Sequence, residues 1–261
     1  MYELPGLTAA TDAWWAGLAA AFRAEGLTEV PRELTRTDDA AALWSAPDLL
    51  FSQTCGYPLT HALAGRVTLL ATPVYDCPGC DGGLYHSEIL LRADDPAEGL
   101  VDLRGRRAAV NAVDSQSGFS ALRHAVAPLA EGGCFFAEVT RSGSHLASMA
   151  LVAEGAADVC AIDCVTYHLA RRGDPDLAAR LRPLTRSATA PALPYITRRD
   201  IPAVELTRLR AGLARACADP GLAETRAALA IKGVVVKPLS DYDLILQLEA
   251  EAVAAGYPDL A

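Results

Sequence analysis

The stretch AAVNAVDSQSG at residues 108–118 passes from a short apolar strand through a polar turn into the start of a helix. The turn contains Ser115, Gln116, Ser117 and Gly118. The first backbone N–H groups of a helix have no acceptor inside it. Serine hydroxyls beside those groups, with a glycine that permits close approach, form a cradle for an oxyanion. An ordinary N-cap serine is an equally weighted interpretation of these residues.

A second strand-to-helix turn, RSGSH at residues 141–145, repeats this pattern. It places His145 near a helix start, where an imidazole tends to be neutral and able to donate one hydrogen bond. A lone histidine is more often structural, so this turn by itself favours a structural role. Asp163 follows an apolar strand at residues 159–162, and ligands of α/β proteins gather at the carboxyl ends of strands. Both side chains are therefore kept as candidate ligands.

A third polar segment, SQTCGYP at residues 52–58, follows another predicted strand and is rich in turn-forming residues. Thr54, Cys55 and Tyr57 are its candidate ligand-binding residues. A plain loop is the alternative interpretation of this segment.

The cysteines do not form a recognisable metal site. The motif CPGC at residues 77–80 suggests a redox pair or half of a zinc site, but no second such motif supplies the remaining ligands. We predict structural thiols, no metal and no cofactor. The chain has seven cysteines, an odd number, so a reducing compartment is the simpler interpretation.

Along the whole chain, apolar runs of strand length alternate with amphipathic helical patterns. The runs that we assign to strands are 49–52, 67–71, 89–92, 108–111, 135–139, 159–162, 193–196 and 233–236. Such alternation predicts an α/β fold with largely parallel sheets.

Two clusters of proline and glycine, at residues 73–83 and 183–194, mark the places where we expect the chain to cross between two lobes. The first predicted lobe comprises residues 1–84 plus 195–261, and the second comprises residues 85–194. Lobes joined by two short connections rotate about a hinge and close on a ligand in the cleft between them.

The charge and hydropathy of the chain exclude several classes of partner. Lys and Arg total 23 against 32 Asp and Glu, a formal charge of -9 that repels nucleic acids and anionic lipid surfaces. No apolar run approaches the roughly 20 residues of a membrane span, so we predict no membrane insertion. The opening residues lack the basic region of a secretory signal. We therefore expect a cytoplasmic location, or a periplasmic one if the N-terminus is trimmed.

Five short motifs follow one another in a characteristic order. They are LRGRRAAVN at 103–111, SQSG at 115–118, GSH at 143–145, GAAD at 155–158 and LPYIT at 193–197. In this order and spacing they resemble the phosphonate-binding family of ABC-importer substrate-binding proteins. The likeness spans about residues 48–197.

The resemblance implies a periplasmic-binding-protein type 2 fold, in which two α/β lobes close on phosphate, phosphite or a phosphonate. Members of the family hold the ligand through hydroxyls and amides at a helix start, which match Ser115, Ser117 and Gly118 here. A histidine before the next helix matches His145.

The resemblance also implies ligand-contacting tyrosines in the first lobe and at the crossing, which match Tyr57 and Tyr85. The first strand of the family would precede Tyr2, so Tyr2 would lie at the end of that strand. We add Tyr2 to the candidate ligand-binding residues. Members that bind aminoalkylphosphonates carry an acidic residue in a region that reads PALP here, at residues 191–194. Asp163 is then the main acidic candidate, which argues against an amino-phosphonate ligand.

We therefore predict a non-enzymatic, monomeric solute-binding protein that captures a small oxyanion or phosphonate-like molecule for an ABC-transporter permease. An enzyme on the same fold, acting on a small anionic metabolite, is the second interpretation, and a residue pair within hydrogen-bond reach would favour it. A ligand-sensing domain of a transcription regulator is the third, and the net charge of -9 counts against it.

Overall fold

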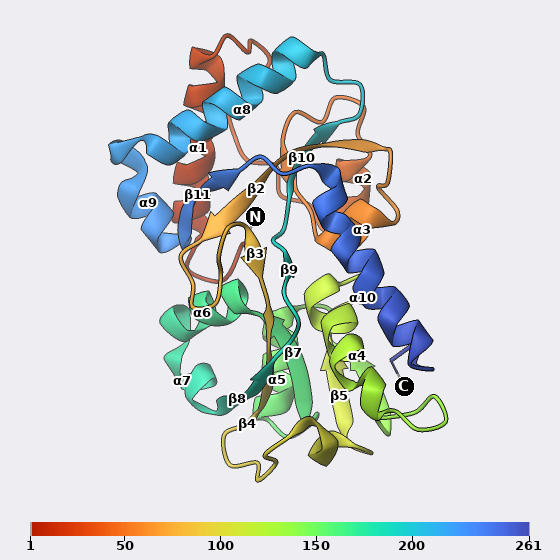
Figure 1. Cartoon of the computed structure of the whole chain (residues 1–261). Coiled ribbons are helices and arrows are strands. Elements are labelled where there is room, and N and C mark those ends of the chain that lie inside the picture. Colours follow the sequence, from red (N-terminus) through yellow and green to blue (C-terminus); the bar gives the residue numbers. More distant parts are fainter. Residues whose placement is uncertain (1, 261) are drawn as a thin grey trace. The chain divides into compact units, whose positions relative to one another are not determined.

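The computed structural model describes residues 2–260, and the chain divides into two compact units (Figure 1). Unit 1 comprises Met1–Gly83 and Pro191–Asp241, and unit 2 comprises Leu84–Ala190 and Tyr242–Ala261. The first crossing falls one residue from the predicted one and the second falls four residues before it. The larger difference is at the C-terminus: residues 242–261 belong to unit 2, whereas the sequence placed them in the first lobe.

Unit 1 is built on a four-stranded sheet of order β1-β10-β2-β11. Its strands are β1 (Ser52–Gln53), β10 (Tyr195–Arg198), β2 (Val67–Tyr75) and β11 (Ile231–Val235). Its helices are α1 (Thr8–Ala24), α2 (Ala40–Trp44), α3 (Gly56–Thr60), α8 (Ala203–Ala218) and α9 (Ala223–Ala228). Helices α1 and α8 pack closely, and Gly212 of α8 permits this approach because it has no Cβ. A Cβ at that position would lie 2.6 Å from Phe22 Cδ1 of α1.

Unit 2 contains a five-stranded sheet of order β6-β5-β7-β4-β8. Its strands are β6 (Glu138–Arg141), β5 (Arg107–Val110), β7 (Val159–Asp163), β4 (Ser87–Arg92) and β8 (Leu181–Arg186). Its helices are α4 (Ala121–Val126), α5 (His145–Ala153), α6 (Cys164–Gly173), α7 (Pro175–Ala179) and α10 (Asp243–Ala254). A separate two-stranded ladder joins β3 (Leu84–Tyr85) to β9 (Ala190–Pro191), where the chain changes unit.

The expectation of largely parallel sheets is wrong. Every ladder of the unit 1 sheet is antiparallel, and in unit 2 only the ladders of β5 with β6 and β7 are parallel among those described. The path of the chain explains this. Strand β4 leads away from one crossing and β8 leads back to the other, so their directions are opposite. Strands β2 and β10 are related in the same way in unit 1.

Two of the predicted strands are shorter than expected. The predicted strand 49–52 is represented only by β1, which begins at Ser52. The run 135–139 becomes a strand only at Glu138, because Phe135 and Phe136 turn into the core of unit 2 and pack edge to face at 4.9 Å. Their apolar character was mistaken for a strand signal.

The C-terminal segment belongs to unit 2 because its apolar face completes the core of that unit. Tyr257 and Leu260 are buried in the same cluster as Leu122 of α4. Arg123, also on α4, donates to the Pro258 carbonyl at 2.6 Å and to Glu249 Oε1 at 3.0 Å. This buried arginine fastens the segment to α4.

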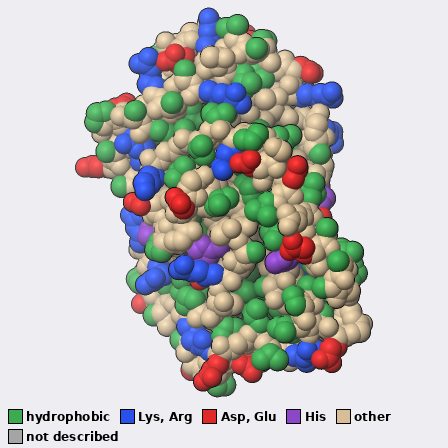
Figure 2. All heavy atoms as spheres, in the orientation of Figure 1, with side chains coloured by type: hydrophobic (Ala, Val, Ile, Leu, Met, Phe, Trp, Pro, Cys, Tyr) green, Lys and Arg blue, Asp and Glu red, His purple; other side chains and the backbone are tan. Residues whose placement is uncertain are grey.

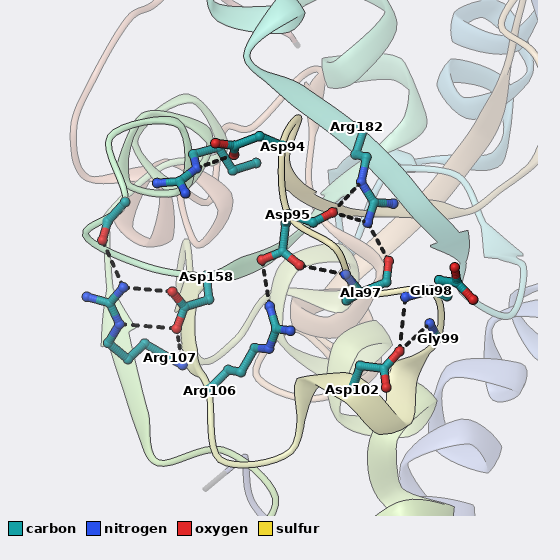
Figure 3. Close-up of polar contacts among 12 residues, drawn as sticks. Asp94, Asp95, Ala97, Glu98, Gly99, Asp102, Arg106, Arg107, Asp158 and Arg182 are labelled. Carbon is teal, nitrogen blue, oxygen red and sulfur yellow. Dashed lines mark hydrogen bonds and ion pairs between the residues drawn. The ribbon is translucent and has the colours of Figure 1, made fainter.

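A network of arginines and aspartates holds the connection between β4 and β5 onto the sheet (Figure 3). Arg106 pairs with Asp95 at 2.6 Å, and Arg182 of β8 donates to the Asp95 carbonyl at 2.7 Å. Arg107 makes a forked contact with Asp158 at 2.7 and 3.1 Å. The arginine-rich motif at the start of β5 is therefore used for structure.

Charged side chains of both signs are interspersed over the face of the molecule that Figure 2 shows. That face carries no broad patch of a single sign. Within residues 2–260, the helices are too short or too polar to cross a membrane.

We expect Arg123→Ala to lower the free energy of unfolding by roughly 2 kcal/mol, because two charge-assisted hydrogen bonds from a buried group are lost. Chemical denaturation followed by circular dichroism measures the change. Arg92→Ala is the control, since Arg92 pairs with Asp94 in a largely exposed ion pair, and it should leave stability nearly unchanged. Equal effects of the two substitutions would contradict the fastening role of Arg123.

Candidate functional site

The turn at residues 115–118 begins a helix, as the sequence predicts. Ser115 is the N-cap, and its Oγ accepts a hydrogen bond from the Gly118 amide at 3.0 Å. Gln116–Ser120 form one π-helical turn, closed by the Ser120 amide on the Ser115 carbonyl at 3.0 Å, and α4 follows. Such widened turns occur frequently at functional sites. The N-cap interpretation is therefore correct for Ser115, whereas Ser117 has a different contact.

Ser117, His145 and Asp163 lie together although they are far apart in the sequence. Ser117 Oγ is 2.9 Å from His145 Nε2, and the same nitrogen is 3.4 Å from Asp163 Oδ2. His145 opens α5, after the N-cap Ser144. Asp163 is 1% exposed and caps α6 by accepting from the Thr166 amide at 2.8 Å. Three helix starts therefore meet at one place, which we call the cradle.

The His145 ring is neutral in this setting. Burial lowers the pKa of His145, and the Asp163 carboxylate acts weakly in the opposite sense. With a carboxylate facing Nε2, the favoured tautomer carries its hydrogen there, and the ring then donates toward Asp163 and Ser117. The hydroxyl hydrogen of Ser117 is left available for an acceptor such as a ligand oxygen.

Gly118 is required at its position by close packing. A Cβ at this residue would overlap Asn111 Oδ1 and would lie 3.1 Å from His145 Cε1. Asn111 ends the strand of the motif but was not among the predicted ligands. Its Oδ1 and the Nδ1 of His145 are buried atoms with no hydrogen-bond partner among residues 2–260. In this tautomer both atoms are acceptors, so each can contact a hydroxyl group of a bound molecule but not an anionic oxygen.

Two more predicted ligand-binding residues of unit 2, Gln116 and Tyr85, are almost fully buried. Gln116 is 2% exposed and begins the π-helical turn. Tyr85 is 2% exposed and lies in β3. Ser87, which the sequence did not single out, supports the cradle from β4, because its Oγ donates to the Ser117 carbonyl at 2.9 Å. No local pattern marks Ser87, since the contact joins two segments 30 residues apart.

The other predicted residues lie in unit 1. Tyr2 meets Tyr75 edge to face at 5.4 Å, and Tyr57 stacks on His61 at 3.8 Å. Thr54 is 2% exposed, and its amide donates to the Pro194 carbonyl at 3.0 Å. Cys55 is the N-cap residue of α3. Their roles in ligand binding stay predictions.

None of the seven cysteines, all of which lie within residues 2–260, forms a disulfide. No cluster of three His, Cys, Asp or Glu side chains arranged for a metal ion occurs in that same range.

We expect Gly118→Ala to destabilise unit 2 by about 1–3 kcal/mol, the usual cost of forcing extra atoms into a packed site. Chemical denaturation measures this. Gly99→Ala is the matched control, because a Cβ at Gly99 meets no atom within 4 Å and should be tolerated. An unchanged stability of the Gly118 variant would show that Asn111 and His145 are not held as described.

Acidification should destabilise the fold through His145. Because the folded pKa is below the ordinary value of 6.5, the unfolded chain takes up a proton first as the pH falls. This contribution to stability is present above pH 6.5 and is lost as the pH falls below it. Melting temperatures measured from about pH 7 to 5 should therefore fall less steeply in His145→Gln than in the wild type. Parallel curves would contradict a buried neutral imidazole.

Several solved structures of binding proteins are similar to this chain. A binding protein component of an ABC phosphonate transporter from Pseudomonas aeruginosa has a TM-score of 0.76 at 16% identity, covering 95% of this chain and 84% of that one. PhnD1 from Prochlorococcus marinus, solved with methylphosphonate, has a TM-score of 0.65 at 15% identity, covering 91% and 82%. A Xanthomonas citri protein bound to ATP has a TM-score of 0.69 at 20% identity, covering 95% of both chains.

These likenesses show the two-lobed binding-protein fold that the sequence predicted. A search of the curated proteins found no match. The model of a protein family does match, over residues 41–242, and its description is ABC transporter, phosphonate, periplasmic substrate-binding protein. This description overturns the expected cytoplasmic location, which rested on the lack of basic residues at the start of the sequence and on the odd number of cysteines. Because the match spans more than three quarters of the chain, the chain belongs to the family of phosphonate periplasmic substrate-binding proteins of ABC transporters.

Proposed function

We propose that this protein captures a phosphonate, phosphite or phosphate anion at the cradle and presents it, as a monomer, to an ABC-transporter permease. The observation that carries the proposal is the Ser117 hydroxyl, held by His145 and backed by Asp163 at the start of a helix. Two proteins of the same fold support it, since one holds methylphosphonate and another holds ATP, which share tetrahedral phosphorus oxyanions.

The cradle suits such an anion because its donors converge without carrying charge. The Ser117 hydroxyl has a hydrogen to donate, and it lies at the start of a helix, where the first amides point out of the helix and the Gly118 amide is capped by Ser115 Oγ. The starts of α5 and α6 add the positive ends of two helix dipoles. An anion bound in this way needs no lysine or arginine, which favours reversible capture and release.

The geometry favours binding over catalysis. Ser117 and His145 do lie within hydrogen-bond reach, which is the feature that would favour an enzyme. In a serine nucleophile system, however, the carboxylate orients the ring through the nitrogen opposite the serine. Here Asp163 and Ser117 face the same nitrogen, Nε2, so the imidazole is not oriented to take the serine proton while the carboxylate stabilises the resulting cation from the opposite nitrogen.

The state of Asp163 supports a simple phosphonate rather than an aminoalkyl one. One carboxylate oxygen accepts from the Thr166 amide and the other faces His145. With 1% exposure, the side chain has little surface left for an ammonium group. The region that carries an acidic residue in amine-binding members reads PALP here, at residues 191–194.

Isothermal titration with methylphosphonate, phosphite and phosphate tests the proposal. We expect at least one of these anions to bind, and Ser117→Ala to weaken it by roughly 1–2 kcal/mol, about 5- to 30-fold, because one hydroxyl to a charged oxygen is lost. Ser45→Ala, at an exposed serine of unit 1, should bind like the wild type. The absence of both heat and a melting shift with all three anions would refute the proposed ligand class. Unchanged affinity in Ser117→Ala would refute the site.

A further inference from the structure

A second cluster of titratable side chains lies in unit 2 and takes no part in the cradle described above. Cys164 is the first residue of α6, directly after β7. Its backbone amide donates to the His86 carbonyl at 2.9 Å, and the neighbouring residues Ser87 and Asp163 pair across β4 and β7. Cys164 and His86 are each 4% exposed. A thiol and an imidazole are therefore buried side by side.

The His86 ring connects the thiol to a carboxylate and a guanidinium. One hydrogen bond joins its side chain to that of Cys164. Its Nε2 is 3.0 Å from Glu88 Oε1, and Arg186 donates to that oxygen at 3.1 Å. The four side chains form a continuous row from sulfur to guanidinium, with the same order of thiol, imidazole and carboxylate that activates cysteine nucleophiles.

The charges of this row favour a thiolate. The hydrogen bond to Cys164, followed by that to Glu88, raises the pKa of His86 to about 9, so the ring is a cation at neutral pH. Burial acts against ionisation of Glu88, but His86 and Arg186 together lower the pKa of its carboxyl. The first turn of α6 adds the positive end of a helix dipole at the sulfur.

Three other titratable side chains lie close to Cys164 along the chain. Asp163, the N-cap residue of α6, carries a charge that opposes a thiolate, but its oxygens are directed to the Thr166 amide and toward His145 of α5. His168 follows one turn later on α6 and is partly exposed. Burial raises the pKa of the Tyr167 hydroxyl, so that group is neutral.

The remaining cysteines provide a contrast. Burial raises the pKa of the Cys160 thiol, which is fully enclosed in β7. Burial also raises the pKa of the Cys217 thiol to about 11. Cys134 is exposed and is a suitable internal reference for an ordinary thiol.

We propose that Cys164 is an activated thiol that small uncharged peroxides oxidise to a sulfenic acid. The Cys164 thiolate attacks one oxygen of hydrogen peroxide, the S–O bond forms and the O–O bond breaks. The sulfur is oxidised by two electrons as the peroxide is reduced. His86 gives its proton to the leaving hydroxide, which departs as water. With 4% exposure, Cys164 is shielded from bulky thiol reagents, so the oxidant in the test has to be as small as hydrogen peroxide.

The test is the pH dependence of oxidation in the native wild-type protein. Brief treatment with hydrogen peroxide is followed by denaturation, blocking of remaining thiols, reduction of sulfenic acid and labelling with heavy iodoacetamide. Peptide mass spectrometry then gives a rate for each cysteine. An ordinary thiol, with a pKa near 8.5, loses about tenfold in rate per unit of pH below that value. The exposed Cys134 gives the reference slope in the same sample, and we expect the rate at Cys164 to stay nearly constant from about pH 8 to 6.

Two variants identify the groups responsible. His86→Gln should remove the plateau and slow the oxidation of Cys164 at pH 7 by about tenfold or more, since an ordinary thiol is only a few per cent ionised there. His124→Gln is the matched control, because His124 also pairs with a glutamate, Glu251, at 2.9 Å. It should leave Cys164 unchanged.

A Cys164 rate that falls in parallel with that of Cys134 would overturn the proposal, as would the absence of sulfenic acid at Cys164 under conditions that oxidise Cys134. The pH profile of the wild type decides the question even if His86→Gln fails to fold. No ligand enters this experiment, so its outcome is independent of the proposed function.

Discussion

The buried carboxylate of Asp163 is the constraint on which the rest of unit 2 depends. A carboxylate with 1% exposure is tolerated only when its oxygens are hydrogen-bonded or paired. Asp163 meets this requirement with the Thr166 amide, which fixes the start of α6, and with His145, which fixes the orientation of that ring. The ring in turn positions Ser117. The geometry of the cradle therefore follows from the need to satisfy one acidic group.

Several arginines of unit 2 are engaged in the structure, so the anion site that we propose relies on uncharged donors. Arg106, Arg107 and Arg182 bind aspartates and carbonyls of their own unit, and Arg123 fastens the C-terminal segment. Their charges are neutralised in structural contacts. What the cradle offers instead is directed hydrogen bonds, which read the shape and protonation of an oxyanion more sharply than a diffuse positive field does.

Two chemistries share the junction between β7 and α6. Asp163 faces the cradle, and the next residue, Cys164, faces His86 and Glu88. A helix start supplies amides and a dipole to both neighbours at once, so in our two proposals the same backbone feature serves an oxyanion and a thiolate. Oxidation of Cys164 would modify the residue directly after Asp163, whose carboxylate organises the cradle.

The sequence by itself determined the features that a few consecutive residues encode. The capped turn at Ser115 and the helix start at His145 are both local, because a cap acts on the backbone within four residues of itself. The alternation of strands and helices is equally local, which is why the α/β class was predictable. The order of the family motifs added the two-lobed fold.

Tertiary structure decided what depends on segments distant in the chain. Ser117 meets His145 across 28 residues, and Cys164 meets His86 across a still longer separation. The strands are antiparallel because the chain leaves and returns through two crossings. The composition of an apolar run is the same in either direction, so it does not reveal the direction of the strand. The C-terminal helix belongs to unit 2 because its buried face packs into the core beside Leu122. An apolar helix face does not by itself specify which of the two units it packs against. Local patterns specify which residues are buried, whereas only packing specifies what they are buried against.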